Sequence, residues 1–118
     1  MPERDLLKAV LDYLAAEHVL AFRMAVGATT VGNRFFRWGT PGMADVIAFP
    51  RVWIFAPFPG HAHWEAGPVL WLETKTAKGK QSPLQRSFQL QVEEYGHRYA
   101  IIRSLDDLIS ALGTWRTP

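Results

Sequence analysis

The segment VLWLETKTAKGK, Val69–Lys80, ends an apolar run with two opposite charges, and its placement decides the fold. Side chains along a strand point alternately to its two faces, so Trp71, Glu73 and Lys75 are expected to share one face. That face is apolar where the strand begins and charged where it ends. A surface ion pair is the simplest explanation of Glu73 and Lys75, and such pairs add little stability. The competing hypothesis is a site at the margin of the core, in which the two charges act together.

Two further carboxylates favour a site. Asp45 opens the apolar strand DVIAF, directly after a Gly/Pro turn that could bring it level with the charged end of a neighbouring strand. Glu3 precedes Leu7 and Val10 by four and seven residues, so it belongs to the inward stripe of a first helix. The alternative for Glu3 is an acid in the first turn of a helix, where it interacts favourably with the helix dipole and faces water.

Converging carboxylates repel one another, and a single carboxylate is costly to bury. A bound divalent cation would resolve both problems. Because the chain contains no cysteine, any metal must be held by oxygen or imidazole, and the hard oxygen atoms of these carboxylates favour Mg²⁺ or Mn²⁺ over zinc.

Composition limits the class of protein. The 118 residues suit one domain, 1–118, and the 48% hydrophobic and 20% charged residues are ordinary for a globular protein. No apolar run reaches the roughly 20 residues of a membrane span, and charges stand where a signal peptide would be apolar. We therefore expect a cytoplasmic chain without membrane association. The net charge of +2 weakly favours a polyanionic partner.

Periodicity and turn residues predict the elements. A first helix is expected over Pro2–His18, with an apolar stripe of Leu7, Val10 and Leu14 that Leu6 and Leu11 widen. Residues 27–32 are expected to form a turn, and residues 50–68 an extended hairpin or flap. A second helix should start after the N-cap Ser82, and a third after Ser104. Strands are expected over residues 19–26, 33–38, 44–49, 69–76 and 98–103, and the second helix should bury Leu84, Phe88, Val92 and Tyr95. The order α-β-β-β-β-α-β-α predicts an α/β domain, a mixed sheet flanked by helices.

Four segments in order, GTPGMADVIAF, LWLETK, GKQSPLQRSF and YAIIRSLDDL, resemble the VRR-NUC (virus-type replication-repair nuclease) branch of the PD-(D/E)xK nucleases. The resemblance runs from Glu3 to about Leu112 and implies a restriction-endonuclease-like fold. Two features depart from the family pattern. Ala44 stands where a proline usually precedes the aspartate, and the stretch Pro50–Pro68 is longer than the pattern requires.

The resemblance also implies the site. Asp45 and Glu73 would bind Mg²⁺ or Mn²⁺, with the backbone carbonyl of Thr74 as a third protein ligand. Lys75 would be the catalytic lysine, which orients the attacking water and offsets charge on the phosphate. Glu3 matches an acidic residue of the leading helix that would lie in the outer shell of the metal.

Other residues have two possible roles each. Gln85 matches a glutamine of the family's site, but a capping box with Ser82 explains it equally well. Four basic residues, Arg34, Arg37, Lys78 and Lys80, suit contacts with DNA phosphates, although each also suits a solvated surface.

The resemblance predicts a metal-dependent DNA endonuclease, first of all one acting on branched DNA in the manner of a Holliday junction resolvase. Two alternatives stay open, a less selective single-strand or flap nuclease and an inactive DNA-binding or assembly module. The complete set of Asp45, Glu73 and Lys75 argues against the inactive module. Because a junction needs two symmetric cuts, a homodimer is expected, with the aromatic segment 50–64 at its interface.

Overall fold

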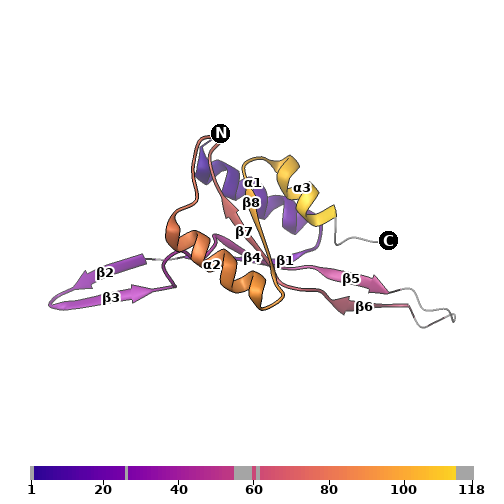
Figure 1. The fold of residues 1–118 in the computed structure, drawn as a ribbon, viewed down its shortest axis with the longest axis horizontal. Helices are drawn as coiled ribbons and strands as arrows, with labels where there is room; N and C mark the ends of the chain where they lie inside the picture. Colours follow the sequence, from indigo (N-terminus) through magenta and orange to yellow (C-terminus); the bar gives the residue numbers. More distant parts are fainter. Residues whose placement is uncertain (1, 26, 55–59, 61, 114–118) are drawn as a thin grey trace.

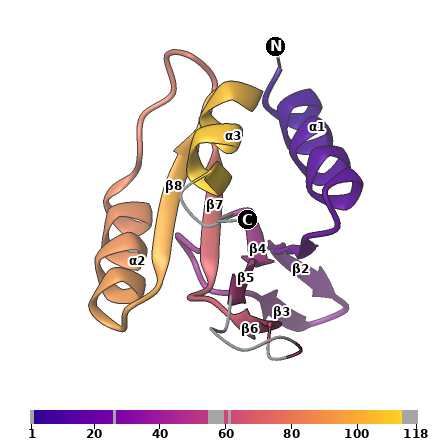
Figure 2. The ribbon, with the colours of Figure 1, turned by 90° about the vertical axis from the view of Figure 1, so that its right-hand side faces the viewer.

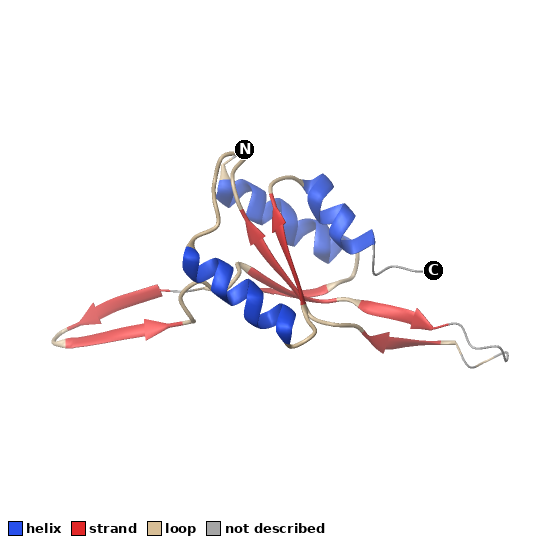
Figure 3. Cartoon of the chain, viewed as in Figure 1, coloured by secondary structure: helices blue, strands red, loops and turns tan. Residues whose placement is uncertain are grey.

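The computed structural model describes residues 2–25, 27–54, 60 and 62–113. Three helices and a sheet form the body of the molecule, and two hairpins extend from it (Figures 1 and 3). The elements in chain order are α1 (Glu3–Ala16), β1 (Leu20–Arg23), β2 (Gly27–Val31), β3 (Arg34–Trp38), β4 (Val46–Phe49), β5 (Arg51–Ile54), β6 (His63–Ala66), β7 (Leu70–Thr74), α2 (Pro83–Glu94), β8 (Arg98–Ile102) and α3 (Leu105–Gly113).

The central sheet has four strands in the order β1-β4-β7-β8. The first three strands are antiparallel, whereas β7 and β8 are parallel because α2 carries the chain back between them. Helices α1 and α3 lie on one side of the sheet and α2 on the other, as Figure 2 shows. This arrangement confirms the predicted α/β class with a mixed sheet. Within the part of the chain that the structure describes, no helix is both long and apolar enough to cross a membrane.

The core lies between α1, α3 and the sheet. On α1 the fully buried positions are Leu6, Val10 and Leu14, which confirms the predicted apolar face, although Leu6 lies well within it and Leu7 at its half-buried margin. At about 100° per residue, Leu6 and Leu14 lie roughly 40° to either side of Val10, whereas Leu7 lies about 60° away. The sheet and α3 contribute the other buried side chains, namely Val46, Ala48, Leu70, Leu72, Ile102, Leu108 and Leu112.

Helix α2 starts as predicted, with a complete capping box at Ser82 and proline in its first turn, and Gly96 follows it with φ 85°. Its predicted buried face is right only in part: Phe88 and Val92 are half-buried, but Leu84 and Tyr95 are exposed and no described α2 side chain is fully buried. The reason is that α2 covers only the β7–β8 end of the sheet. Its main contact there is the ring of Phe88, whose centroid lies 5.0 Å from that of Trp71.

Two hairpin arms project from opposite ends of the body (Figure 1). The longest principal extent, 63 Å, is about twice the other two, 31 and 26 Å. The β5–β6 arm confirms the hairpin predicted within residues 50–68, of which 55–59 and 61 lie outside the described residues.

The second arm, β2–β3, corrects the sequence prediction, because residues 27–31 form a strand and not a turn. Thr29, Thr30 and Val31 are β-branched and favour a strand, and the turn is confined to the two residues that follow. Gly32 has φ 62°, which fits the first central position of a type II′ turn. Among the described residues seven strands therefore precede α2, whereas four were predicted besides the hairpin of residues 50–68.

Candidate metal and catalytic site

The end of β7 brings together three segments that are far apart in the sequence. Val46 pairs with Leu72, so the residue before β4, Asp45, comes level with Glu73 on the neighbouring strand. The first turn of α2 brings Gln85 to the same place. All three line one cleft of about 320 Å³, together with Arg23, Met24 and Met43 among others.

Asp45 is held in position by the adjacent strand. Its Oδ2 accepts a hydrogen bond from the Thr74 backbone N–H at 2.8 Å and another from the Thr74 hydroxyl at 2.7 Å. The backbone carbonyl of Asp45 also accepts a hydrogen bond from the N–H of Met24 at 2.7 Å. Hydrogen bonds to a carboxylate are stronger than neutral ones, so the orientation of Asp45 is fixed before any ligand binds.

Glu73 is the unusual group of the site. Its side chain is only 2% exposed, and its Oε2 has no hydrogen-bond partner. Burial, followed by hydrogen bonding and charge from the adjacent Asp45 carboxyl, raises the pKa of Glu73 to about 8. The charge of Lys75 opposes this shift of the Glu73 pKa, and the charge of Glu3 adds to it. A surface ion pair with Lys75 is therefore the wrong explanation of Glu73, which lies inside the protein.

A divalent cation fits the residues present. Two adjacent carboxylates, one of them buried with an oxygen that lacks a donor, are stabilised by a positive ion between them. No group of three or more His, Asp or Glu side chains in the described residues converges as a metal site. Mg²⁺ commonly binds through one or two carboxylates and completes its shell with water and phosphate oxygens, as Asp45 and Glu73 would allow. The backbone carbonyl of Thr74 stays a predicted ligand.

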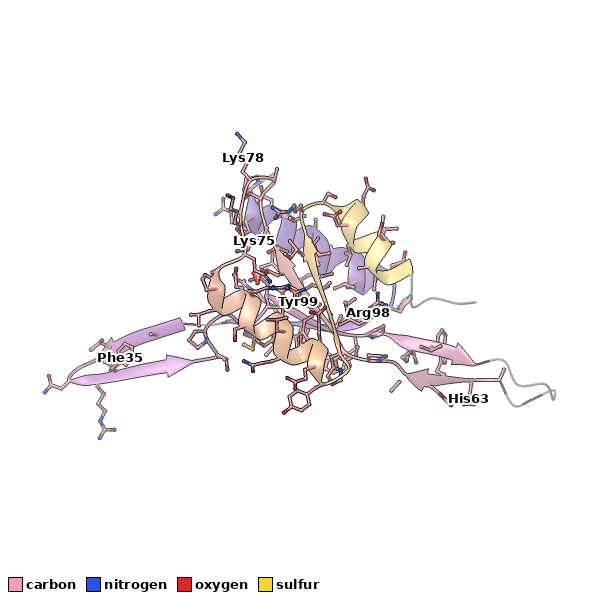
Figure 4. All side chains as sticks on the ribbon, viewed as in Figure 1. Phe35, His63, Lys75, Lys78, Arg98 and Tyr99 are labelled. Carbon is pink, nitrogen blue, oxygen red and sulfur yellow. The ribbon has the colours of Figure 1, made fainter. Side chains whose placement is uncertain are left out.

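Lys75 and Glu3 flank the two carboxylates. Lys75 is half-buried just beyond β7, and its backbone N–H donates to the carbonyl of Ile102 at 3.0 Å. In Figure 4 Lys75 lies near the base of the loop that follows β7, with Lys78 farther out along that loop. Glu3 is exposed in the first turn of α1, three residues before the buried Leu6. Its charge reaches Glu73 although its side chain is not buried, which agrees with an outer position around the site.

Both roles of Gln85 are compatible with the geometry. Its Oε1 accepts a hydrogen bond from the Ser82 backbone N–H at 2.9 Å, while its own N–H donates to the Ser82 hydroxyl at 3.2 Å. Because the carboxamide oxygen is used by the cap, the NH₂ group is left to donate into the cleft that Gln85 lines. Capping thus fixes the side chain and leaves one donor for a ligand.

The four predicted phosphate contacts fall in two places. Lys78 and Lys80 are exposed on the loop that follows Lys75, close to the carboxylates in the chain. Arg34 is exposed beside the turn at the tip of the β2–β3 arm. Arg37 is on the same arm in β3, and its side chain lies outside the described part of the structure.

Sequence reasoning missed Arg103, which holds the loop after β7. One nitrogen of its guanidinium donates to the carbonyls of Thr76 and Gly79, both at 2.7 Å, and less closely to that of Ala77. Arg103 follows β8, and the ends of adjacent parallel strands meet at the same edge of a sheet. That rule could have pointed to Arg103 as a neighbour of the Lys75 loop.

No protein-family model, curated protein or solved structure matches this chain. The family assignment therefore depends on the motifs in the sequence and the site they form.

Proposed function

We propose that the chain is a Mg²⁺- or Mn²⁺-dependent deoxyribonuclease of the VRR-NUC type with a restriction-endonuclease-like fold. The observation that carries the proposal is Glu73, a buried glutamate with an oxygen that lacks a donor, beside the fixed Asp45 carboxylate. Burying a carboxylate without a partner costs several kcal/mol at most sites, on the order of 2–5. A cation-binding role explains why the fold maintains this arrangement.

Each residue of the site then has a task in phosphodiester hydrolysis. Asp45 and Glu73 hold the cation, which when bound stabilises the negative charge that develops on the phosphate. Lys75 orients the attacking water and adds positive charge at the phosphate as a P–O bond to water forms and a P–O bond to a sugar oxygen breaks. The NH₂ group of Gln85 donates a hydrogen bond into the same cleft, and Glu3 acts from the outer shell.

Branched DNA is the proposed substrate, and the proposed assembly is a homodimer. Two symmetric cuts in a four-way junction need two copies of the site, since one chain has a single Asp45–Glu73–Lys75 set. The β5–β6 arm offers aromatic surface for an interface, because Trp64 is 52% exposed. Of the segment 50–64 predicted at this interface, the side chain of Trp53 and residues 55–59 and 61 lie outside the described residues.

Two other functions make different predictions. A single-strand or flap nuclease would act as a monomer and would not prefer four-way junctions. An inactive DNA-binding or assembly module would bind DNA without cutting it, and would have no need for the buried Glu73 and the fixed Asp45.

The experiment is a cleavage assay on end-labelled four-way junctions, flaps, single strands and linear duplexes, with Mg²⁺, Mn²⁺ or a chelator. We expect metal-dependent cleavage, fastest on the junction, by a protein that light scattering shows to be a dimer. Asp45→Asn should abolish cleavage and leave the apo protein as stable or more stable, because it removes the repulsion with Glu73. Asp12→Asn, a change of equal charge on the exposed face of α1, is the control and should cut like the wild type. Full activity of Asp45→Asn, or cleavage in chelator, would disprove the proposed function.

A further inference from the structure

The β2–β3 arm is rooted in the wall of the candidate catalytic cleft. The chain enters the arm through Arg23 and Met24 and leaves it through Gly42 and Met43, and all four residues line the cleft. The hydrogen bond from the Met24 N–H to the Asp45 carbonyl, 2.7 Å long, ties the root of the arm to the metal-binding carboxylate. A long ligand bound along the arm would therefore extend directly into the cleft.

The rest of the chain gives this arm little support. Strands β2 and β3 pack chiefly on each other, and the arm points away from the body in Figures 1 and 3. An isolated two-stranded hairpin is only marginally stable in water. The arm nevertheless exposes apolar side chains, since Val31 is 64% and Phe35 63% exposed. The arm therefore presents exposed apolar side chains that a partner can cover.

Charge identifies the class of partner. Residues 23–43 contain three arginines and no aspartate or glutamate, whereas residues 50–67, which contain the other arm, have one arginine and one glutamate. Arg23 at the root and Arg34 near the tip are both exposed. A positively charged arm beside a phosphodiesterase centre is complementary to a polyanion. A two-stranded β-ribbon is also one of the elements that the major groove of B-form DNA admits.

We propose that the β2–β3 arm binds duplex DNA on one side of the cleaved phosphate. This inference rests on the proposed nuclease function and adds to it a requirement for double-stranded DNA next to the cut. A strand of five residues spans about 17 Å, and the turn takes the tip to roughly 20 Å. At about 3.4 Å per base pair, the arm covers on the order of six base pairs.

Equilibrium binding tests the arm without depending on cleavage. Wild type, Arg34→Glu and the control Arg98→Glu are titrated without metal against fluorescent four-way junctions with arms of 4, 6, 8 and 12 base pairs, at several salt concentrations. Arg98 is exposed at the start of β8, outside both arms and the cleft, so the control makes the same change of charge at a position outside the proposed DNA contact. Melting temperatures of the three proteins establish that each is folded.

We expect Arg34→Glu to weaken binding to the junction with 12-base-pair arms at least tenfold. The slope of log affinity against log salt concentration should become shallower by the equivalent of about one released ion or more. Wild-type affinity should fall when the junction arms are shorter than about six base pairs, and Arg34→Glu should lose this length dependence. Arg98→Glu should bind like the wild type. Unchanged binding by Arg34→Glu, or an equal loss in Arg98→Glu, would overturn the role of the arm. Failure of the nuclease proposal would instead appear as tight, arm-dependent binding by a protein that cleaves no DNA.

Discussion

Replacing Glu73 with glutamine should make the apo protein more stable at neutral and alkaline pH. In the folded protein the pKa of Glu73 is raised from its ordinary value of 4.5 to about 8, chiefly by burial and then by Asp45. Below pH 4.5 the carboxyl is protonated in both the folded and the unfolded chain and has no effect. As the pH rises from 4.5 to about 8, the unfolded chain releases the proton while the folded chain keeps it, so the free energy of unfolding falls.

The size of this effect follows from the pKa difference. One pKa unit corresponds to about 1.36 kcal/mol, so Glu73 should lower the free energy of unfolding by about 3 kcal/mol at pH 7 and about 4–5 kcal/mol above pH 8. Glutamine has no such titration and can still form a hydrogen bond with Asp45. The free energy of unfolding of Glu73→Gln should therefore exceed that of the wild type by roughly these amounts. The difference should vanish towards pH 4.

Urea denaturation between pH 4 and 9, with and without Mg²⁺, measures the prediction. Mg²⁺ needs the ionised carboxylate, so at pH 8 it should stabilise the wild type strongly and Glu73→Gln much less. The control is Glu94→Gln, which makes the same change at an exposed position near the end of α2. If wild type and Glu73→Gln show the same pH dependence and the same response to Mg²⁺, Glu73 is neither a strained buried carboxylate nor a metal ligand.

Three further substitutions test the surroundings of the site. Glu3→Gln should slow cleavage at saturating Mg²⁺ about tenfold or more if it acts in the outer shell, but should only lower stability by about 0.3–1 kcal/mol if it is a first-turn acid. Gly42→Ala should destabilise the fold by at least about 1–3 kcal/mol more than Gly96→Ala in thermal unfolding. Both glycines need φ near 85°, but only a Cβ at position 42 would lie 2.5 Å from the backbone of α2. Arg103→Ala should reduce the cleavage rate about tenfold by freeing the loop after β7. Arg86→Ala should leave the rate unchanged, because the Arg86 guanidinium donates to Gln89 one turn away on α2. An Arg103→Ala enzyme as fast as the wild type would show that the loop needs no such support.

Local patterns predicted the helices and the sheet strands of the body well. The capping box at Ser82 and the apolar run before Glu73 are signals contained within a few residues, and the structure confirms both elements. The α/β class followed from their order. The prediction that failed was the burial of Leu84 and Tyr95 on α2. Whether these side chains are covered depends on how far the sheet extends beneath the helix. No local pattern carries that information.

The β2–β3 arm shows a second limit of prediction from the sequence. The strand at residues 27–31 was taken for a turn because its glycine and threonines are also turn residues, and because it pairs only with β3. At the site, the sequence predicted that Asp45 and Glu73 lie together, and the register of β4 and β7 brings them level. The sequence did not predict the hydrogen bonds that the Thr74 hydroxyl and the Arg103 guanidinium donate. These hydrogen bonds depend on which residues lie opposite each other where neighbouring strands end.

The most direct test of the central claim is the cleavage of a bound four-way junction by Lys75→Ala, measured under single-turnover conditions with saturating Mg²⁺. Lys75 is proposed to act on the water and the phosphate, whereas DNA affinity comes from many phosphate contacts. The account predicts that Lys75→Ala binds and folds like the wild type but cleaves at least about a thousandfold more slowly. Lys78→Ala removes the same charge from an exposed position on the same loop and should weaken binding slightly while cleaving at nearly the wild-type rate. Wild-type cleavage by Lys75→Ala would contradict the account.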